Sequence, residues 1–178
     1  MLPWACLSNA SRYAVPDKLC RADDALGSSR ASINSGTLAR VKPTLVAGLE
    51  FAKNLTVDES RVIGFMGDDC RVYATPRIIS DIEYACRNFL LEHLDQGEDS
   101  VGTRVNVEHV GPALLGASVT IAVKVARVDG RRVTFEASVR DGTDDVLRGA
   151  HERSVVSIEK VRERLRNKRA QQAQQQQQ

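Results

Sequence analysis

The sequence predicts an α+β fold in which an antiparallel sheet wraps around one long central helix. Two observations lead to this prediction. Residues 75–93 carry apolar side chains at helical spacing, whereas the later segments alternate apolar and polar side chains with the period of β-strands. Asp-Gly dipeptides at 129–130 and 141–142 separate the last three of these segments as hairpin turns do, because both central positions of a type I′ turn need a positive φ.

The first elements of the domain are a strand and an irregular loop. Residues 49–57 alternate in part and predict the first strand. Residues 58–73 contain Gly64, Gly67 and an adjacent pair of aspartates, which together predict a loop or flap leading into the helix.

The helix has a clear start signal in the tripeptide Ala-Thr-Pro at residues 74–76. We expect Thr75 at the N-cap, where its hydroxyl accepts a bond from an unpaired backbone N–H, and Pro76 at the first helical position, where it has no N–H to lose. The apolar pattern runs to about His93, and Asp-Gln-Gly at 95–97 ends the helix. The apolar positions are Ile78, Ile79, Ile82, Ala85, Cys86, Phe89 and Leu90. Because they lie on more than one side, we expect the sheet to cover the helix largely.

The remaining segments predict four antiparallel strands. Val105, Val107 and His109 share one face of the first of these strands. The strands are expected over residues 105–109, 119–125, 133–139 and 146–158. One long helix combined with five antiparallel strands that wrap it is the hotdog architecture, a member of the α+β class.

Length and charge limit the function classes. The chain has 178 residues, the size of one domain with additional ends. Residues 1–42 carry 6 basic and 3 acidic side chains, residues 43–158 carry 13 and 18, and residues 159–178 carry 6 and 2. The acidic middle region argues against a nucleic-acid-binding core, which should itself be basic. No apolar run approaches the roughly 20 residues that span a membrane, so we expect neither a nucleic-acid nor a membrane partner.

Three regions follow from these patterns. We expect a leader over residues 1–42, a hotdog domain over 43–168 and a disordered glutamine-rich tail over 169–178. The leader is rich in basic residues, serine and alanine, as organellar transit peptides are, and it predicts a mitochondrial location. Its three aspartates are atypical of such peptides, so a cytoplasmic location is the alternative. Residues 159–169 predict a short basic helix.

Cysteine and histidine usage excludes several kinds of site. The chain has four cysteines without Cys-x-x-Cys spacing and only three histidines. We therefore expect neither a disulfide framework nor a bound metal. Cys86 falls within the helix pattern and is expected to be a small core residue.

Three polar residues and one glycine are candidates for a site. Glu83 lies two turns beyond Thr75 on the predicted helix, so both can project along the same side. His109 shares its strand face with two valines and is expected to point into apolar surroundings, where an imidazole beside a buried carboxylate is poised for proton transfer. Gly102 lets the backbone approach a ligand closely.

Each candidate also has a purely structural explanation. Thr75 can act as a simple N-cap, Glu83 can be an exposed carboxylate paired with Arg87 one turn later, and His109 can be a hydrogen-bonded core histidine. The sequence His-Glu-Arg at 151–153 forms a second polar cluster, which a cross-strand salt bridge explains as well as catalysis does.

Several ordered motifs resemble one known family. They are Tyr73-Ala74-Thr75-Pro76, Glu83-Tyr84-Ala85-Cys86, Ser100-Val101-Gly102-Thr103, Val128-Asp129-Gly130-Arg131-Arg132, Asp141-Gly142 and Gly149-Ala150-His151-Glu152-Arg153. With this spacing, and with His109 seven residues after Gly102, the chain resembles the fluoroacetyl-CoA thioesterase-like hotdog proteins over about residues 42–168.

The resemblance implies a hotdog homodimer that hydrolyses acyl-CoA thioesters without a metal or other cofactor, coenzyme A being part of the substrate. The family's catalytic threonine, glutamate and histidine match Thr75, Glu83 and His109, and its active-site glycine matches Gly102. Residues 65–70 have no clear counterparts of the family's lid phenylalanines, so a small or medium acyl-CoA is implied rather than fluoroacetyl-CoA in particular.

Other functions are compatible with the same residues. A hotdog enoyl-CoA hydratase or dehydratase also uses a histidine with a carboxylate but leaves the thioester intact. In a non-catalytic acyl-CoA-binding module, the three polar residues would only satisfy one another. Nucleic-acid binding through the basic C-terminal segment is a third alternative, and it predicts an affinity that depends strongly on salt.

Overall fold

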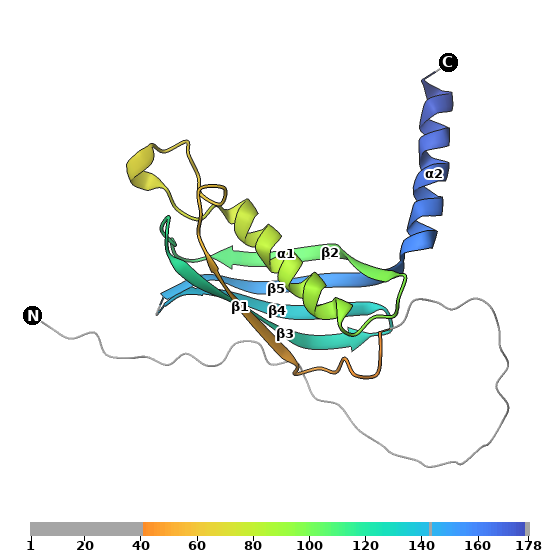
Figure 1. Cartoon of the computed structure of the whole chain (residues 1–178), viewed down its shortest axis with the longest axis horizontal. Coiled ribbons are helices and arrows are strands. Elements are labelled where there is room, and N and C mark those ends of the chain that lie inside the picture. The colour runs from red at the N-terminus through yellow and green to blue at the C-terminus, as the bar shows by residue number, and fades with distance from the viewer. Residues whose placement is uncertain (1–40, 143, 177–178) are drawn as a thin grey trace, which may run out of the picture. The chain divides into compact units, whose positions relative to one another are not determined.

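The structure, a computed structural model, describes residues 41–142 and 144–176, so residues 1–40 of the predicted leader lie outside it. An antiparallel sheet of five strands carries helix α1 across one face (Figure 1). The strand order is β1-β3-β4-β5-β2, which places β1 and β2 at the two edges. The elements are β1 (Glu50–Thr56), the short 3-10 helix η1 (Asp68–Cys70), α1 (Thr75–Leu91), β2 (Glu98–His109), β3 (Ser118–Asp129), β4 (Arg132–Asp141), β5 (Asp144–Ser157) and α2 (Ile158–Gln175). The predicted α+β class is confirmed.

The three central strands form a meander whose turns fall at the two Asp-Gly dipeptides. Asp129 pairs with Arg132 across the first turn, and Asp141 pairs with Asp144 across the second. The glycine of each turn adopts a left-handed conformation, with φ of 58° and 57°, which a residue without a Cβ atom reaches at no steric cost. Both predicted hairpins are confirmed.

Helix α1 buries one stripe of side chains against the sheet. The buried residues are Ile78, Ile82, Ala85, Cys86, Phe89 and Leu90, spaced three or four positions apart as in an amphipathic helix. The ring of Phe89 meets Phe135 of β4 edge-on, with 6.4 Å between ring centroids. Burial raises the pKa of the Cys86 thiol to about 12, so Cys86 is a core residue as predicted. Tyr84 on the outer side of α1 is 58% exposed, so the sheet of this chain covers one side of the helix.

The start of α1 differs from the prediction by one residue. Ala74 is the N-cap and has no side-chain capping bond, whereas Thr75 is the first helical residue. The predicted N-cap role of Thr75 is therefore wrong, because its hydroxyl is engaged by a side chain from another element. The helix also ends at Leu91, two residues before the expected end near His93.

Strand β2 contains a break in its pairing with β5. Gly102 pairs with Arg153 and Arg104 pairs with Glu152, so Thr103 is an extra residue on β2. Such a β-bulge bends the strand and re-aims nearby side chains, and bulges are common beside active sites.

Helix α2 follows β5 directly and is longer than predicted. The sequence predicts a short helix over 159–169 and disorder from 169 onward, yet the helix continues to Gln175. Glutamine and alanine lose little side-chain freedom in a helix, so this tail forms a helix without any buried residue. Among the described residues, no helix is both long and apolar enough to cross a membrane.

Candidate active site

The four predicted site residues lie on two neighbouring elements. Thr75 and Glu83 are on α1, whereas Gly102 and His109 are on β2, and α1 lies beside β2 (Figure 1). The structure brings them together as two pairs, Thr75 with His109 at the start of α1 and Glu83 with Gly102 about two turns further along the helix.

The first pair joins Thr75 to His109. The Oγ1 atom of Thr75 lies 2.7 Å from Nδ1 of His109, a hydrogen-bond distance. Both residues are exposed, so the prediction that His109 points into apolar surroundings is wrong. The reason is the strand order: β2 is a sheet edge, and its last residue pairs only with Leu147 of β5. The pair is therefore open to a ligand.

The second pair joins Glu83 to Gly102. A Cβ atom on Gly102 would lie 2.5 Å from Oε1 of Glu83 and 3.1 Å from Cε1 of His151. The carboxylate thus occupies the space that any larger residue at position 102 would need. The Glu83 side chain is 43% exposed, so one part of it faces the strand and another part faces outward.

The imidazole beside Glu83 is that of His151 rather than the expected His109. His151 is fully buried on β5, and its Nε2 atom lies 3.8 Å from Oε1 of Glu83. Nδ1 is 2.9 Å from the Arg104 carbonyl oxygen, and Nε2 is 3.1 Å from Nη1 of Arg153. Because a guanidinium only donates, Nε2 accepts and the ring proton resides on Nδ1. Burial lowers the pKa of His151, which keeps the ring neutral.

Arg153 lies in the same buried layer and fastens the helix to the sheet. Its Nε donates to Oγ of Ser100 at 2.9 Å, and its Nη2 donates to the Ser100 carbonyl at 2.7 Å. Nη1 lies 3.3 Å from the backbone oxygen of Glu83, which connects the guanidinium to α1. Burial lowers the pKa of Arg153, while the negative charge of Glu83 opposes this shift. Arg153 thereby holds the backbone of Glu83 against the sheet.

The sequence predicts a polar cluster at residues 151–153, but it does not indicate that His151 and Arg153 belong to the site. Glu152 fits the structural explanation, since its Oε1 lies 3.9 Å from Nη1 of Arg104 across the strand pair. His151 and Arg153 point to the opposite face, toward α1. The alternation of a strand was the available signal, because it places residues 151 and 153 together and residue 152 apart from them.

A cleft of about 540 Å³ lies over Glu83. Its lining residues are Ser80, Glu83, Tyr84, Arg87 and Arg153. Arg87 does not pair with Glu83 as one structural explanation proposed; its Nε donates to Oδ1 of Asp99 at 2.9 Å. Within the described residues, no group of three or more His, Cys, Asp or Glu side chains is placed to hold a metal ion.

Comparison with solved structures places the fold among the hotdog thioesterases. The fold superposes on a structure described as the structural basis of the activity and substrate specificity of the fluoroacetyl-CoA thioesterase, with a TM-score of 0.64, 28% identity, and coverage of 70% of this chain and 97% of the other. A hot-dog-like protein from Thermanaerovibrio acidaminovorans matches with a TM-score of 0.64, 27% identity, and coverage of 71% and 93%. A thioesterase superfamily member from Thermus thermophilus shares the fold at a TM-score of 0.66 and 24% identity, over 72% and 96% of the two chains.

Sequence comparison identifies the family. Residues 57–159 match the family described as fluoroacetyl-CoA-specific thioesterase, and the fluoroacetyl-CoA thioesterase of Streptantibioticus cattleyicolor is 35% identical over 97 residues, which cover 54% of this chain and 70% of the relative. The chain belongs to the fluoroacetyl-CoA-specific thioesterase family. It is a thioester hydrolase of the hotdog class, which confirms the predicted fold and enzyme class. The hydratase and binding-module alternatives are not favoured.

Proposed function

We propose that the chain hydrolyses a small or medium acyl-CoA thioester to the free acid and CoA, and that Thr75, Glu83, Gly102 and His109 form the site. The placement of the Glu83 carboxylate against Gly102 is the observation that carries this proposal. A half-exposed carboxylate that lines a cleft, with a buried guanidinium and a neutral imidazole behind it, is held in place yet free to react on its open side.

The substrate carbonyl lies near the N-terminus of α1 in this proposal. The N–H groups of Arg77 and Ile78 already donate to the Ala74 carbonyl, at 2.8 and 3.0 Å, and Pro76 has no N–H. The helix dipole, rather than a row of free N–H donors, therefore favours negative charge on the carbonyl oxygen as the tetrahedral intermediate forms. Thr75 and the backbone of Gly102 add local polar groups.

Two mechanisms use the same residues, with Glu83 of one copy meeting Thr75 and His109 of a second copy, because six pairing positions of about 3.3 Å separate Gly102 from His109 along β2 of one chain. As a nucleophile, the Glu83 carboxylate attacks the thioester carbonyl and forms an anhydride, while the CoA thiolate leaves and takes a proton from His109; water then hydrolyses the anhydride to the acid and the Glu83 carboxylate, and the proton released from water returns to His109. As a general base, Glu83 takes a proton from the attacking water instead. In both, the Thr75 hydroxyl orients the His109 ring through their 2.7 Å contact.

Release of free thiol from acyl-CoAs of graded chain length tests the activity and ranks the substrates. We expect wild-type protein to release thiol and the Glu83→Gln variant to be slower by orders of magnitude while remaining folded. Single-turnover hydrolysis in ¹⁸O water separates the two mechanisms, because water that attacks the Glu83 carbonyl of an anhydride leaves its label in that carboxylate, whereas general-base attack puts the label in the acid alone. A Glu83→Gln variant as fast as wild type would remove Glu83 from the site, and no release from any ester would contradict the activity.

We also propose that two copies of the chain form a homodimer through the β2 edge. An open edge strand presents unpaired N–H and C=O groups to another chain. Val101 and Val105 of β2 and Tyr84 of α1 are large, exposed apolar side chains along this edge. Analytical ultracentrifugation of wild-type protein and a Val101→Lys variant tests the proposal, with dissociation expected in the variant and a monomeric wild type as the contradicting result.

The proposed location is mitochondrial, with the cytoplasm as the alternative. The basic, serine-rich composition of residues 1–42 supports this proposal. Fusion of residues 1–42 to a fluorescent reporter tests it, since a mitochondrial leader directs the reporter to that organelle and a diffuse signal contradicts it.

A further inference from the structure

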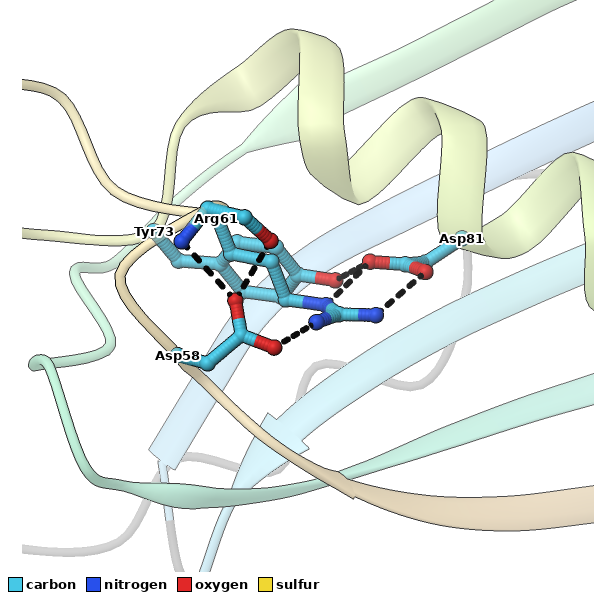
Figure 2. Close-up of polar contacts among 5 residues, drawn as sticks. Asp58, Arg61, Tyr73 and Asp81 are labelled. Carbon is cyan, nitrogen blue, oxygen red and sulfur yellow. Dashed lines mark hydrogen bonds and ion pairs between the residues drawn. The ribbon is translucent and has the colours of Figure 1, made fainter.

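Another polar cluster lies between the flap and α1, outside the residues used in the proposed mechanism. It consists of Asp58, Arg61, Tyr73 and Asp81, and we call it the Asp81 cluster (Figure 2). The flap comprises residues 58–73. Asp58 and Arg61 lie near its start, and Tyr73 is its last residue. Asp81 is in the second turn of α1. The cluster therefore connects both ends of the flap to the helix.

The contact between Arg61 and Asp81 is two-pronged. Nε of Arg61 donates to Oδ2 of Asp81 at 3.0 Å, and Nη2 lies 3.4 Å from Oδ1. The remaining nitrogen, Nη1, donates to Asp58, whose other oxygen accepts from the backbone N–H and hydroxyl of Ser60 at 2.9 and 2.6 Å. The guanidinium is thus held between two carboxylates in a fixed plane, which is more specific than a single ion pair.

Tyr73 adds a buried contact to the same carboxylate. Its side chain is fully buried, and its hydroxyl donates to Oδ2 of Asp81 at 2.5 Å. Burial, followed by the hydrogen bond to the Asp81 carboxylate, raises the pKa of Tyr73, so the phenol keeps its proton and remains a donor. Oδ2 of Asp81 therefore receives both Tyr73 and Arg61, which fixes the two ends of the flap relative to each other.

Backbone hydrogen bonds join the two ends of the flap next to the Asp81 cluster. The Ala74 N–H donates to the Arg61 carbonyl at 2.8 Å, and the Ile63 N–H donates to the Val72 carbonyl at 3.0 Å. Phe65 and Met66 lie beyond this closure and are strongly exposed. The base of the flap is therefore a short paired segment, and the Asp81 cluster fastens this base to α1.

The cluster encloses the first turn of the helix. Tyr73 precedes Thr75 by two residues and Asp81 follows it by six, so their contact closes the chain around Thr75. Successive helical residues are rotated by about 100°, which places Asp81 and Glu83 on opposite flanks of the buried stripe of α1. Arg153 holds α1 on the Glu83 flank, and the Asp81 cluster holds it on the other.

We propose that Asp81, with Arg61 and Tyr73, is a positioning residue for thioester hydrolysis. The cluster fixes the first turn of α1 and the base of the flap, and it thereby keeps the Thr75 hydroxyl on the His109 ring. None of the three residues touches the reacting atoms. The inference rests on the proposed role of Thr75, and its test is arranged so that the two can fail separately.

The first measurement compares three single variants of the full chain. Asp81→Asn keeps the shape and an acceptor for Tyr73 but removes the charge that orients Arg61. We expect kcat for thiol release to fall about 10- to 100-fold, because displacement of a positioned group by about 1 Å has effects of this size. Tyr73→Phe removes only the hydroxyl and should give a smaller loss in the same direction. Glu50→Gln is the matched control, since Glu50 pairs with Lys124 at 3.0 Å between β1 and β3, and its kcat should be unchanged.

Hydrogen exchange supplies a readout that does not depend on activity. Amide exchange across residues 61–79 should become faster in Asp81→Asn while the β3 and β4 amides keep their rates, and Glu50→Gln should show neither change. If Asp81→Asn does not fold, Tyr73→Phe carries the same comparison, because it leaves the ion pair with Arg61 in place. Unchanged exchange and unchanged kcat in the folded variants would overturn the proposal.

A double-mutant cycle with Thr75 tests whether the cluster acts through that residue. In a Thr75→Ala background, Asp81→Asn should slow kcat by less than about 3-fold, because the group that it positions is already absent. Full additivity of the two losses overturns the positioning role and leaves Thr75 in the site. A Thr75→Ala variant as fast as wild type removes Thr75 from the site and overturns the positioning role with it, so the two failures give different patterns.

Discussion

The hydroxyl of Thr75 lies 2.7 Å from Nδ1 of His109, although the two residues are 34 positions apart in the chain. The contact exists because α1 begins where β2 ends: the helix and the strand lie side by side with the first turn of one next to the last residue of the other (Figure 1). The flap that precedes α1 and the loop that follows β2 also meet there, since the Tyr73 N–H donates to the Ala113 carbonyl at 2.8 Å. One end of the domain thus gathers the polar pair and the two loops that border it.

Substitution of Gly102 by alanine should inactivate the enzyme with little loss of stability. The new Cβ would lie 2.5 Å from Oε1 of Glu83, the end of a flexible side chain that can move away. The displaced carboxylate loses its reactive position, and kcat should fall roughly 100-fold. Thiol-release kinetics with thermal melting measure both effects. Gly64→Ala is the control, because nothing lies within 4 Å of its Cβ position, and it should behave as wild type. Equal activity of the two variants would contradict the proposed site.

Substitution of Gly149 by alanine should instead destabilise the fold. Its Cβ would lie 2.2 Å from the backbone oxygen of Asn106 and 2.6 Å from the Cα of Val107, both on the paired strand β2. Backbone in the sheet interior cannot move aside as a side chain does, so we expect the free energy of unfolding to fall by about 3 kcal/mol. Urea denaturation measures this change. A loss as small as that of Gly64→Ala would show that β2 shifts freely against β5.

Stability should decline as the pH falls below about 6.5, the ordinary pKa of histidine. The native state lowers the pKa of His151, so between the lowered and ordinary values the unfolded chain binds a proton that the native state does not. The contribution of neutral His151 to the free energy of unfolding is present above the unfolded-state pKa and is lost toward acid. The free energy of unfolding then falls by at most about 1.4 kcal/mol per pH unit. Urea denaturation at pH 7.5, 6.5 and 5.5 tests it. His151→Gln should show a shallower decline than wild type over this range; identical slopes in the two proteins would refute the assignment.

Removal of residues 159–178 should leave the domain folded and active. No residue of α2 is buried, so the deletion exposes little apolar surface, and we expect the free energy of unfolding to change by less than about 1 kcal/mol. Denaturation and thiol release by the truncated chain measure the two properties. A larger loss of stability would place α2 in an interface, such as one between two copies. Loss of a salt-dependent affinity for nucleic acid on truncation would support the alternative role of this segment.

Local patterns predicted the elements of the fold well, because their causes are local. The Asp-Gly turns require a left-handed glycine, and the apolar spacing of α1 fits burial of one stripe, so both could be read from a few neighbouring residues. The start of α1 was misplaced by one residue because Thr75 has two possible hydrogen-bond partners. The local sequence pattern favours a bond between the Thr75 hydroxyl and a nearby backbone N–H. In the structure, this hydroxyl contacts His109 instead.

Properties that depend on strand order were not predictable in the same way. His109 was expected in apolar surroundings from its two valine neighbours, but β2 is an edge and leaves the ring exposed. His151 and Arg153 were missed because burial of an imidazole next to a guanidinium is reasonable only when Ser100 and the Arg104 carbonyl are known to be adjacent. Those partners come from a strand about 50 residues earlier in the sequence.

The extra residue Thr103 changes which side of the sheet the later residues of β2 face. Gly102 and His109 are seven positions apart, an odd number, and along an uninterrupted strand they would face opposite sides of the sheet. The bulge restores a common side, and their cross-strand partners Arg153 and Leu147, six positions apart, show the same orientation on β5. With position 103 deleted, β2 would pair regularly with β5, Gly102 and His109 would be six positions apart, and His109 would still face Thr75. Strand alternation therefore predicts the sides that Gly102 and His109 face only when the bulge residue Thr103 is not counted.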